Sequence, residues 1–525
     1  MLEGAWLESE RESDALMVLR REGTGVRVLA SYFVESEGVP AEVVISRKPG
    51  EFVDFYELKH VRMKEATRAV LEFLKEKIIE SANVKTSEML DPREAERVKA
   101  RMAGKAHEII RGELSGLGPH EEDLLVGKLL QEMFGLGEIE LLLADADLEE
   151  VVINNSREPV MVYHKKFGWL KTNVFVSSEE QIQNYASMVG RKAGRQITNL
   201  NPLMDATLLS GSRVNATLYP ISTKGNGITI RKFRADPWTV VNFIDPAVNT
   251  LSAEVAALIW MAQQYELNVL VGGGTASGKT SFLNAMLAFT PPNQRLVSIE
   301  DTRELVLPDF LHWTPLCTRM PNPEGKGEVT MLDLMVNSLR MRPDRIVLGE
   351  IRRQREAEVL FEAMHTGHAV YSTLHADEAL QVKNRLVGPP ISLPEEMIGA
   401  LHLVVVQYRQ RRTGVRRTYE VAEVLPQEGG IALNIVYKWD AREDRLVKVG
   451  DFIRLASEMA LHTGLTGKEL ENDLSEKESV LKWMLAQKIW GVNDVGRVVA
   501  HYYRDRELVV GAARNNVSRK EFFGE

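Results

Sequence analysis

The alternation of hydrophobic and polar positions divides the chain into four regions, residues 1–118, 119–235, 236–440 and 441–525. The first region opens with short strand-like runs and continues into two charged stretches, residues 63–79 and 92–114, whose apolar positions recur at helical spacing. It carries no motif of recognisable chemistry. We therefore interpret it as an α+β scaffold or docking region.

The second region has the pattern of a mixed α/β domain. Apolar runs bounded by turn residues predict strands, a hairpin that turns at residues 210–212 and one helix with Ser177 or Ser178 as its N-cap. These elements are expected at residues 150–154, 160–164, 178–193, 205–219 and 227–233.

The third region begins with a predicted connector. Asp236-Pro237 and Asp245-Pro246 mark it, because the residue before a proline is pushed out of helical geometry. Strand and helix patterns then alternate to about residue 440, as a parallel sheet with crossover helices requires. The last region is helix-rich and acidic, and is predicted to be a helical C-terminal extension of an α/β protein.

Composition narrows the classes of function. At 525 residues the chain should hold roughly two to four domains. A net charge of −9 argues against nucleic-acid binding, which rests on clustered Lys and Arg. The single cysteine, Cys317, excludes an internal disulfide and a cysteine-based zinc site. No apolar run reaches the ~18 residues of a membrane span, and the acidic start is not expected to be a signal peptide.

The strongest motif is GGGTASGKTS, which follows an apolar run and satisfies G-x-x-x-x-G-K-[ST]. Such a loop can point its backbone N–H groups at phosphate oxygens, with Lys279 on the β- and γ-phosphates and the Thr280 hydroxyl on Mg²⁺. The predicted nucleotide-binding residues are Gly273, Gly274, Thr275, Ala276, Ser277, Gly278, Lys279, Thr280 and Ser281.

Two acidic motifs follow the loop. RIVLGE ends a predicted strand at Glu350, with Gly349 where a Walker B strand usually has Asp, so Mg²⁺ would rest on Thr280, the nucleotide and waters ordered by Glu350 and Glu304. RLVSIEDTREL delivers Glu300, Asp301 and Glu304 into one loop. Clustered carboxylates suit a cation or a proton relay, and either Glu304 or Glu300 could orient the attacking water.

A pair of histidines lies on the next predicted strand. His368 and His375 are seven residues apart in TGHAVYSTLHAD, and could sense the γ-phosphate. Their spacing does not fit the i, i+4 pair of a helical zinc site.

Together these motifs resemble the secretion superfamily of ATPases, which includes type II and type IV secretion motors, pilus motors and the archaellum ATPase. The matching stretches are GGGTASGKTS, SIEDTREL, RPDRIVLGEIR and TGHAVYSTLHAD, with upstream likeness in DLEEVVINNSREPVMVYHKKFGWLKTN, DATLLSGSRVNATL and GITIRKF. The likeness covers about residues 121–425, most of all with the archaeal-type branch. It implies a RecA-like P-loop ATPase domain preceded by a PAS-like second N-terminal domain.

The resemblance also implies roles for individual residues. Glu304 would be the leading catalytic carboxylate and Glu350 a second one, and His375 a γ-phosphate sensor. Arg213 and Arg231 would be arginines that the smaller domain offers to the nucleotide, which suits a permanently charged guanidinium. On this resemblance, the arginine pair would give the predicted PAS-like domain a part in catalysis.

At the level of the whole protein, the resemblance implies a homo-hexameric ATP hydrolase that uses ATP and Mg²⁺. It would be cytoplasmic, at the inner face of the membrane through a polytopic platform protein, and would power protein secretion or assembly of a pilus-like or archaellum filament. ATP would close the two domains and product release would reopen them across residues 234–246. Two alternatives stay open, a DNA-translocating or conjugation-associated ATPase, favoured by the basic run 409–417, and a ring subunit that binds ATP without hydrolysing it.

Overall fold

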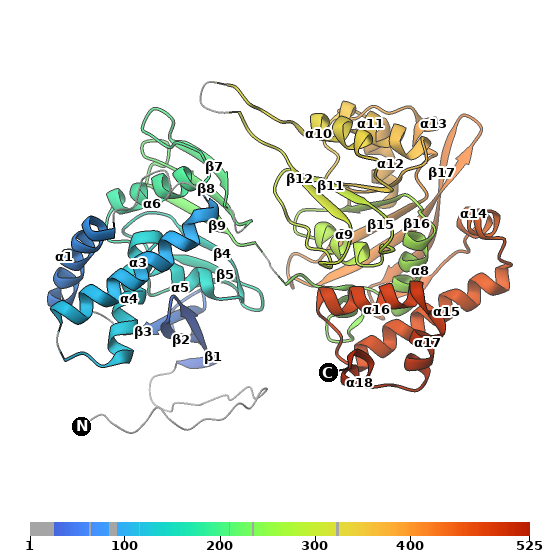
Figure 1. The fold of residues 1–525 in the computed structure, drawn as a ribbon. Coiled ribbons are helices and arrows are strands. Elements are labelled where there is room, and N and C mark those ends of the chain that lie inside the picture. The colour runs from blue at the N-terminus through green and yellow to red at the C-terminus, as the bar shows by residue number, and fades with distance from the viewer. Residues whose placement is uncertain are drawn as a thin grey trace. The chain divides into compact units, whose positions relative to one another are not determined.

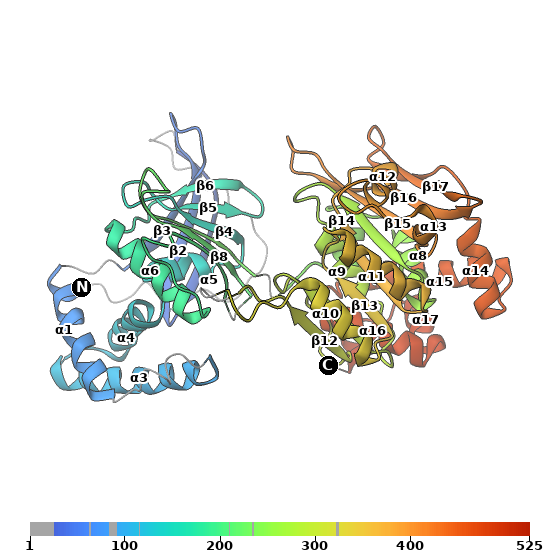
Figure 2. The same cartoon turned by 90° about the horizontal axis from the view of Figure 1, so that it is seen from above.

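A computed structural model describes residues 26–61, 65–82, 92–114, 116–208, 211–233, 236–321 and 325–524. The chain forms two compact units, Met1–Phe233 and Arg234–Glu525 (Figures 1 and 2). Both are mixed α/β, as the sequence predicts, and each is built on a nine-stranded sheet. The finer division into four regions, and the PAS-like and RecA-like names, stay predictions.

The sheet of the first unit has the order β1-β2-β3-β6-β5-β4-β9-β8-β7. Its strands are β1 (Arg27–Ser36), β2 (Val39–Arg47), β3 (Phe55–His60), β4 (Leu148–Ile153), β5 (Met161–His164), β6 (Gly168–Thr172), β7 (Leu203–Thr207), β8 (Arg213–Thr217) and β9 (Gly227–Arg231). Helices α5 (Ile139–Ala144) and α6 (Glu179–Lys192) share its buried core. Helices α1 (Glu65–Ala82), α3 (Pro92–Glu113) and α4 (Pro119–Phe134) form a second, smaller core.

The second unit is called the motor unit here only after the ATPase domain that the resemblance predicts in it. Its sheet has the strand order β12-β11-β13-β14-β10-β15-β16-β17-β18. The strands are β10 (Val269–Gly273), β11 (Leu296–Glu300), β12 (Trp313–Cys317), β13 (Arg345–Leu348), β14 (Ala369–Leu374), β15 (Leu403–Arg409), β16 (Arg416–Gln427), β17 (Gly430–Asp440) and β18 (Arg445–Lys448). From β12 to β15 neighbouring strands are parallel, and from β15 to β18 they are antiparallel.

Helices cover both faces of this sheet (Figure 1). Side chains alternate between the faces, so that Val269 and Val271 lie in one core and Leu270 in the other. The first core packs against α7 (Val240–Ile244), α8 (Ala253–Gln264), α9 (Lys279–Leu287) and the C-terminal helices, and the second against α10 (Met331–Ser338), α11 (Gln354–His365), α12 (Ala379–Val387) and α13 (Glu395–Ile398). A short 3-10 helix, Leu339–Met341, precedes β13.

Most predicted elements are confirmed within a few residues. The helix expected at 178–193 is α6, and Ser178 caps it by accepting a hydrogen bond from the Gln181 N–H. The hairpin expected at 205–219 is β7 and β8, although residue 210 of its turn lies outside the described residues. Two strand-like runs of the first region are β1 and β2.

The connector differs from its prediction. Residues 236–246 were expected to be a linker, but from Thr239 onward they form α7, whose Val240, Val241 and Phe243 are buried in the motor core. The proline signals were correct locally. Burial of the apolar residues between the prolines, however, stabilises a packed helix rather than an exposed linker. Arg234, the start of the expected hinge, lies outside the described residues.

The C-terminal helices α14 (Arg454–Thr463), α15 (Gly467–Ala486), α16 (Val492–Arg504), α17 (Arg506–Arg514) and α18 (Arg519–Phe523) belong to the motor unit. The Trp260 indole of α8 donates to the Tyr503 hydroxyl (3.0 Å). Beside it, the buried Lys477 ammonium pairs with Asp473, which also accepts from the hydroxyls of Tyr502 (3.0 Å) and Tyr265 (3.1 Å). Burial lowers the pKa of Lys477 to about 8, against the attraction of Asp473.

We predict that Lys477→Met destabilises the motor unit by about 3 kcal/mol, because it leaves the buried Asp473 carboxylate with only the more distant guanidinium of Arg506 (3.5 Å) as a cation. Urea denaturation followed by tryptophan fluorescence measures the change. Adding Asp473→Asn should recover part of the loss, since no charge is then buried. The exposed Lys468→Met, on the same helix, is the control, and an equal effect of both lysine variants would contradict the prediction.

Candidate functional site

The predicted motifs meet at one edge of the motor sheet. Strands β11, β13, β14 and β10 are consecutive and parallel, so their carboxyl ends lie side by side. The glycine-rich loop follows β10, Glu300 ends β11, Glu350 lies two residues beyond β13, and His375 follows β14. Motifs far apart in the sequence are therefore brought together by strand order.

The loop between β10 and α9 is tightly folded. Gly273 has φ 149° and Gly278 has φ 95°, and a Cβ at Gly273 would stand 2.4 Å from Ser277 Oγ. The Ser277 hydroxyl closes the loop on the Gly274 carbonyl (2.9 Å). Helix α9 starts directly after it, and its N-cap, Gly278, supplies no side-chain cap. The first N–H groups of α9 are thus left to an anion.

The Lys279 side chain is held inside this loop. Its ammonium donates to the Gly274 carbonyl (3.0 Å) and to His375 Nδ1 (3.4 Å). Burial lowers its pKa, and the carboxylates of Glu350, Asp377 and Glu304 act in the opposite direction. A cation with negative groups around it, but no carboxylate in direct contact, is suited to grip a phosphate.

His375 links this lysine to the acid after β13. Its Nε2 lies 3.0 Å from Glu350 Oε1, while its Nδ1 faces the Lys279 ammonium. An acceptor at Nδ1 and a donor at Nε2 require the neutral ring. Burial and the nearby positive charge of Lys279 both lower the pKa of His375, which favours that form, while Glu350 opposes them. Hydrogen bonds therefore run from the Lys279 ammonium through the neutral His375 ring to the Glu350 carboxylate.

Arg352 occupies the other side of the same acid. Its Nε donates to Glu350 Oε2 (2.7 Å), and its guanidinium also pairs with Asp301 of the acidic loop. Both oxygens of Glu350 are thus engaged by neighbouring side chains. In this arrangement Glu350 orients both His375 and Arg352.

The structure separates the two glutamates that the sequence left open. Glu300 is buried, its Oε1 accepts from the N–H groups of Glu304 (2.9 Å) and Leu305 (3.2 Å), and its Oε2 has no partner among described atoms. Burial raises its pKa to about 7. The Glu304 side chain is half-buried, and its carboxylate bonds to no residue that the structure describes. Glu300 thus holds the loop through its backbone N–H groups, a task in which the Glu304 carboxylate has no part.

The two histidines do not form a pair. His368 precedes β14, where its Nδ1 lies 3.2 Å from the Ala363 carbonyl, and His375 follows the strand. Seven residue steps at about 3.3 Å each put them roughly 23 Å apart. The idea that both sense a phosphate is wrong, because a residue spacing of seven along a strand spans its whole length.

The fit to Mg²⁺ depends on Thr280. Within the described parts of the chain, no three His, Cys, Asp or Glu side chains converge on a point where a metal could bind. Thr280 lies half-buried in the first turn of α9, next to the glycine-rich loop. Mg²⁺ commonly keeps several waters and uses substrate phosphates as ligands, so one hydroxyl beside the loop fits this ion.

Arg213 and Arg231 lie in the first unit. They are register partners on β8 and β9, so both side chains leave the same face of the sheet. Arg213 is 3.8 Å from Asp205, and Arg231 is exposed. Two like charges directly opposite one another are unfavourable in a sheet, and here the Asp205 carboxylate offsets one of them.

Four residues of the site were missed by sequence reasoning. Asp377 Oδ1 would stand 2.6 Å from a Cβ at Gly274, and Arg416 Nε donates to the Ala276 carbonyl (3.0 Å). Asp377 and Arg352 lie inside quoted motifs, so a closer look at those motifs could have found them. Arg416 lies in the basic run that favoured DNA, and Asn284, a buried polar residue of α9, has no sequence signal.

The fold and the site together have the form of a P-loop protein, an α/β protein whose strand–loop–helix unit can hold phosphate. A family model described as "Type II/IV secretion system protein" matches residues 180–414. An uncharacterised protein of Methanocaldococcus jannaschii is 35% identical over 394 residues, 73% of this chain and 70% of that protein. A putative conjugal transfer protein of Mycobacterium tuberculosis is 31% identical over 345 residues, 62% of this chain and 95% of that one.

The chain therefore belongs to the type II/IV secretion system protein family. Among solved structures, the pilus retraction motor PilT with bound ADP is similar with a TM-score of 0.39 and 16% identity. The match covers 69% of this chain and 96% of the PilT chain. Within the described ranges, no helix is both long and apolar enough to cross a membrane.

We predict that Glu300→Gln changes how stability depends on pH. The folded state raises the pKa of Glu300 from 4.5 to about 7, so the folded protein holds the proton more tightly than the unfolded chain. The free energy of unfolding should then fall as pH rises between these values, by up to about 3 kcal/mol. The variant lacks this loss and should be the more stable protein at pH 8, but not at pH 4.5.

Urea denaturation at pH 4.5, 6 and 8 measures this difference. Glu300→Ala is the second variant, because it also removes the acceptor for the loop N–H groups and should be destabilised at every pH. Parallel pH profiles of the wild type and the Glu300→Gln variant would show that folding does not raise the pKa of Glu300.

Proposed function

We propose that the protein is a motor ATPase that hydrolyses ATP in the motor unit. The observation that carries the proposal is the Lys279–His375–Glu350 chain beside a glycine-rich loop and the uncapped N-terminus of α9. Lys279 and the first N–H groups of α9 hold the β- and γ-phosphates. Mg²⁺, when bound through Thr280, the nucleotide and water, neutralises the phosphate charge. Family membership supports the use of ATP.

In the hydrolytic step, the Glu304 carboxylate orients a water molecule against the γ-phosphorus. The water oxygen forms the new bond to phosphorus, the bond to the β–γ bridging oxygen breaks, and ADP leaves with the electron pair. The proton of the water passes to Glu304 or to the phosphate released. His375 contacts both Lys279 and Glu350. When the γ-phosphate leaves, Lys279 loses its partner, and this change reaches Glu350 through His375.

Arg213 and Arg231 are proposed to contact the phosphates of a nucleotide bound by a motor unit. The support is their shared face on β8 and β9 and the exposure of Arg231. A guanidinium that meets the γ-phosphate only when domains close would couple chemistry to movement. The working particle is proposed to be a homo-hexamer at the cytoplasmic face of the membrane, bound to a polytopic platform protein of a secretion, pilus or archaellum machine.

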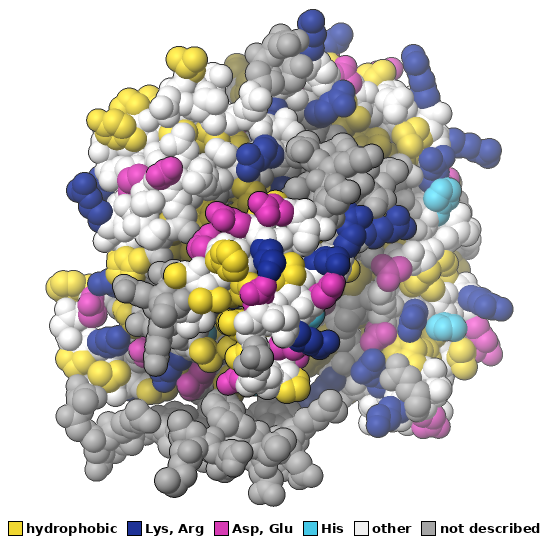
Figure 3. Space-filling model, turned by 60° about the vertical axis from the view of Figure 1, so that its left-hand side comes forward, with side chains coloured by type: hydrophobic (Ala, Val, Ile, Leu, Met, Phe, Trp, Pro, Cys, Tyr) yellow, Lys and Arg dark blue, Asp and Glu magenta, His cyan; other side chains and the backbone are white. Residues whose placement is uncertain are grey.

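A conjugation-associated ATPase is the second candidate, and the relative named as a putative conjugal transfer protein favours it. The basic run that suggested DNA binding gives less support than before. Arg416 bonds to the P-loop, and Arg417 pairs with Asp444 (2.6 Å). On the face drawn in Figure 3, basic side chains are interspersed with acidic ones. Stimulation of the ATPase by DNA would favour this second function over secretion or filament assembly.

We predict that Lys279→Ala loses both nucleotide binding and Mg²⁺-dependent ATPase activity, while Glu304→Gln binds nucleotide and hydrolyses it about 10²- to 10⁴-fold more slowly. Steady-state phosphate release and fluorescent-nucleotide binding separate the two effects. Glu362→Gln, an exposed carboxylate of α11, is the control and should be fully active. Full activity of Glu304→Gln would move the catalytic carboxylate elsewhere, and an inert wild type would favour a non-hydrolysing ring subunit.

For the arginines, we predict that Arg213→Ala and Arg231→Ala each lower kcat by about 10³-fold, as loss of an arginine finger does. Nucleotide binding should be weakened much less, because Lys279 and the loop remain. Arg191→Ala, an exposed arginine of α6, is the matched control. If both variants behave like Arg191→Ala, the arginine pair has no part in hydrolysis.

A further inference from the structure

The acidic loop that carries Glu304 depends on side chains for its backbone hydrogen bonds. It joins β11 to β12 without regular secondary structure. The N–H groups of Glu304 and Leu305 donate to Glu300, that of Val306 to Asn284 Oδ1 (2.8 Å), and that of Asp309 to Asn493 Oδ1 (2.9 Å). Side chains from three elements thus fix the course of the loop.

Two of these anchors come from the parallel sheet and the P-loop helix. Glu300 ends β11, and Asn284 lies on α9, five residues after Lys279. Both are buried, so they fix the Glu304 end of the loop to the elements that bind nucleotide. The third anchor comes from outside this framework.

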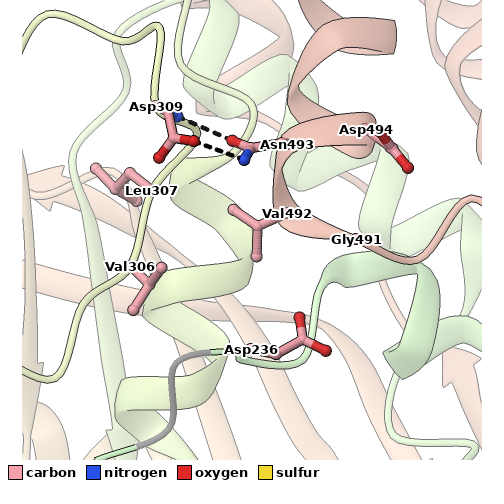
Figure 4. Close-up of a pocket in the computed structure, with 8 residues that line it drawn as sticks. All are labelled: Asp236, Val306, Leu307, Asp309, Gly491, Val492, Asn493 and Asp494. Atoms are coloured by element: carbon pink, nitrogen blue, oxygen red, sulfur yellow. Dashed lines mark hydrogen bonds between the residues drawn. The ribbon is translucent and has the colours of Figure 1, made fainter. Parts of the chain in front are cut away.

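Asn493 lies in the first turn of α16, one of the C-terminal helices. Besides accepting from the Asp309 N–H, its Nδ2 donates to Asp309 Oδ2 (2.8 Å), so the two residues are joined by a pair of hydrogen bonds (Figure 4). Because one bond comes from the Asp309 backbone N–H and the other ends on its carboxylate, the two bonds fix the orientation of the Asn493 amide as well as its distance from the loop.

Packing brings α16 close to the loop at the same point. A Cβ at Gly496 would stand 2.4 Å from Pro308 Cγ, so the helix approaches the loop too closely for a larger residue. Leu305, Leu307 and Val495 lie in the same buried core. The helix is held in turn by the Trp260–Tyr503 hydrogen bond, and the turn before it by the bond from Thr239 Oγ1 to the Trp490 carbonyl (3.1 Å).

One flank of the loop borders a cavity of about 300 Å³. Asp236, Val306 and Leu307 line it together with the start of α16, at residues 491–494 (Figure 4). Packing of the loop against α16 is therefore close at Pro308 but incomplete on this flank. The Asp309–Asn493 pair adds a directional contact beside the cavity.

We propose that Asn493 is a positioning residue for hydrolysis, which holds the Glu304 carboxylate in place through the acidic loop. The C-terminal helices are on this proposal a functional part of the motor unit. The proposal rests on the proposed ATPase function. Thr239 follows the boundary between the two units and bonds to the turn before α16, so the same helices join the start of the motor unit to the acidic loop.

The first test measures kcat and KM for ATP in full-length Asn493→Ala. A displaced carboxylate should lower kcat between tenfold and a hundredfold, with KM nearly unchanged, because the phosphate-binding loop is not altered. Asn472→Ala, an exposed asparagine of α15, is the control and should match the wild type. An unchanged kcat, or a higher KM at unchanged kcat, would overturn the proposal.

A swapped pair separates positioning from general instability. Asn493→Asp alone sets two carboxylates against each other and should lower kcat as Asn493→Ala does. Combining it with Asp309→Asn restores a donor opposite an acceptor in both bonds. Recovery of kcat in the double variant is expected, and failure to recover would count against the pair.

A readout without activity distinguishes this proposal from the ATPase function. Hydrogen exchange of peptides over residues 304–311 should be faster in Asn493→Ala than in the wild type or Asn472→Ala. An inactive wild type would refute the ATPase function, yet the exchange experiment would still decide whether Asn493 anchors the loop. Unchanged exchange would overturn the anchoring itself.

Discussion

The buried ammonium of Lys279 is the charge around which the motor unit is arranged. Burial disfavours it, as the lowered pKa indicates, and nearby carboxylates stabilise it without touching it. That balance is possible because the carboxyl ends of four parallel strands meet beside the P-loop. A closer carboxylate would neutralise the lysine, and a more distant one would leave it too costly to bury. The acidic residues after β11 and β13 therefore stabilise the charge of Lys279, which follows β10.

Local sequence predicted the elements of this site well. The apolar runs before Gly273, Glu350 and His375 are all strands of the motor sheet, and the glycine spacing predicts the loop whose φ angles only glycine adopts freely. These features depend on neighbours in sequence, where periodicity and turn chemistry act. The motif did not predict the place of His368. It gives the spacing of the two histidines in sequence, but not that they lie at opposite ends of β14.

The parts that could not be predicted depend on contacts between distant segments. Asn284 and Asn493 are ordinary polar residues in sequence, more than 200 positions apart, and only tertiary structure shows that both bind one loop. The choice between Glu300 and Glu304 was likewise open, since burial of one carboxylate is decided by the sheet around it. The connector was misjudged because its short apolar run finds partners only once the C-terminal helices and α8 are in place.

Gly349 shows how electrostatics shape this site beyond what sterics require. A Cβ at this position would lie 3.5 Å from Glu300 Cγ, an ordinary contact, so space alone does not demand glycine. An aspartate there, as in a usual Walker B strand, would set a second carboxylate beside Glu300, whose pKa burial has already raised to about 7. Repulsion would then raise the cost of ionising both groups. Glycine keeps Glu300 free of that repulsion, so its carboxyl can hold the acidic loop while Glu350, one residue on, completes the chain to Lys279.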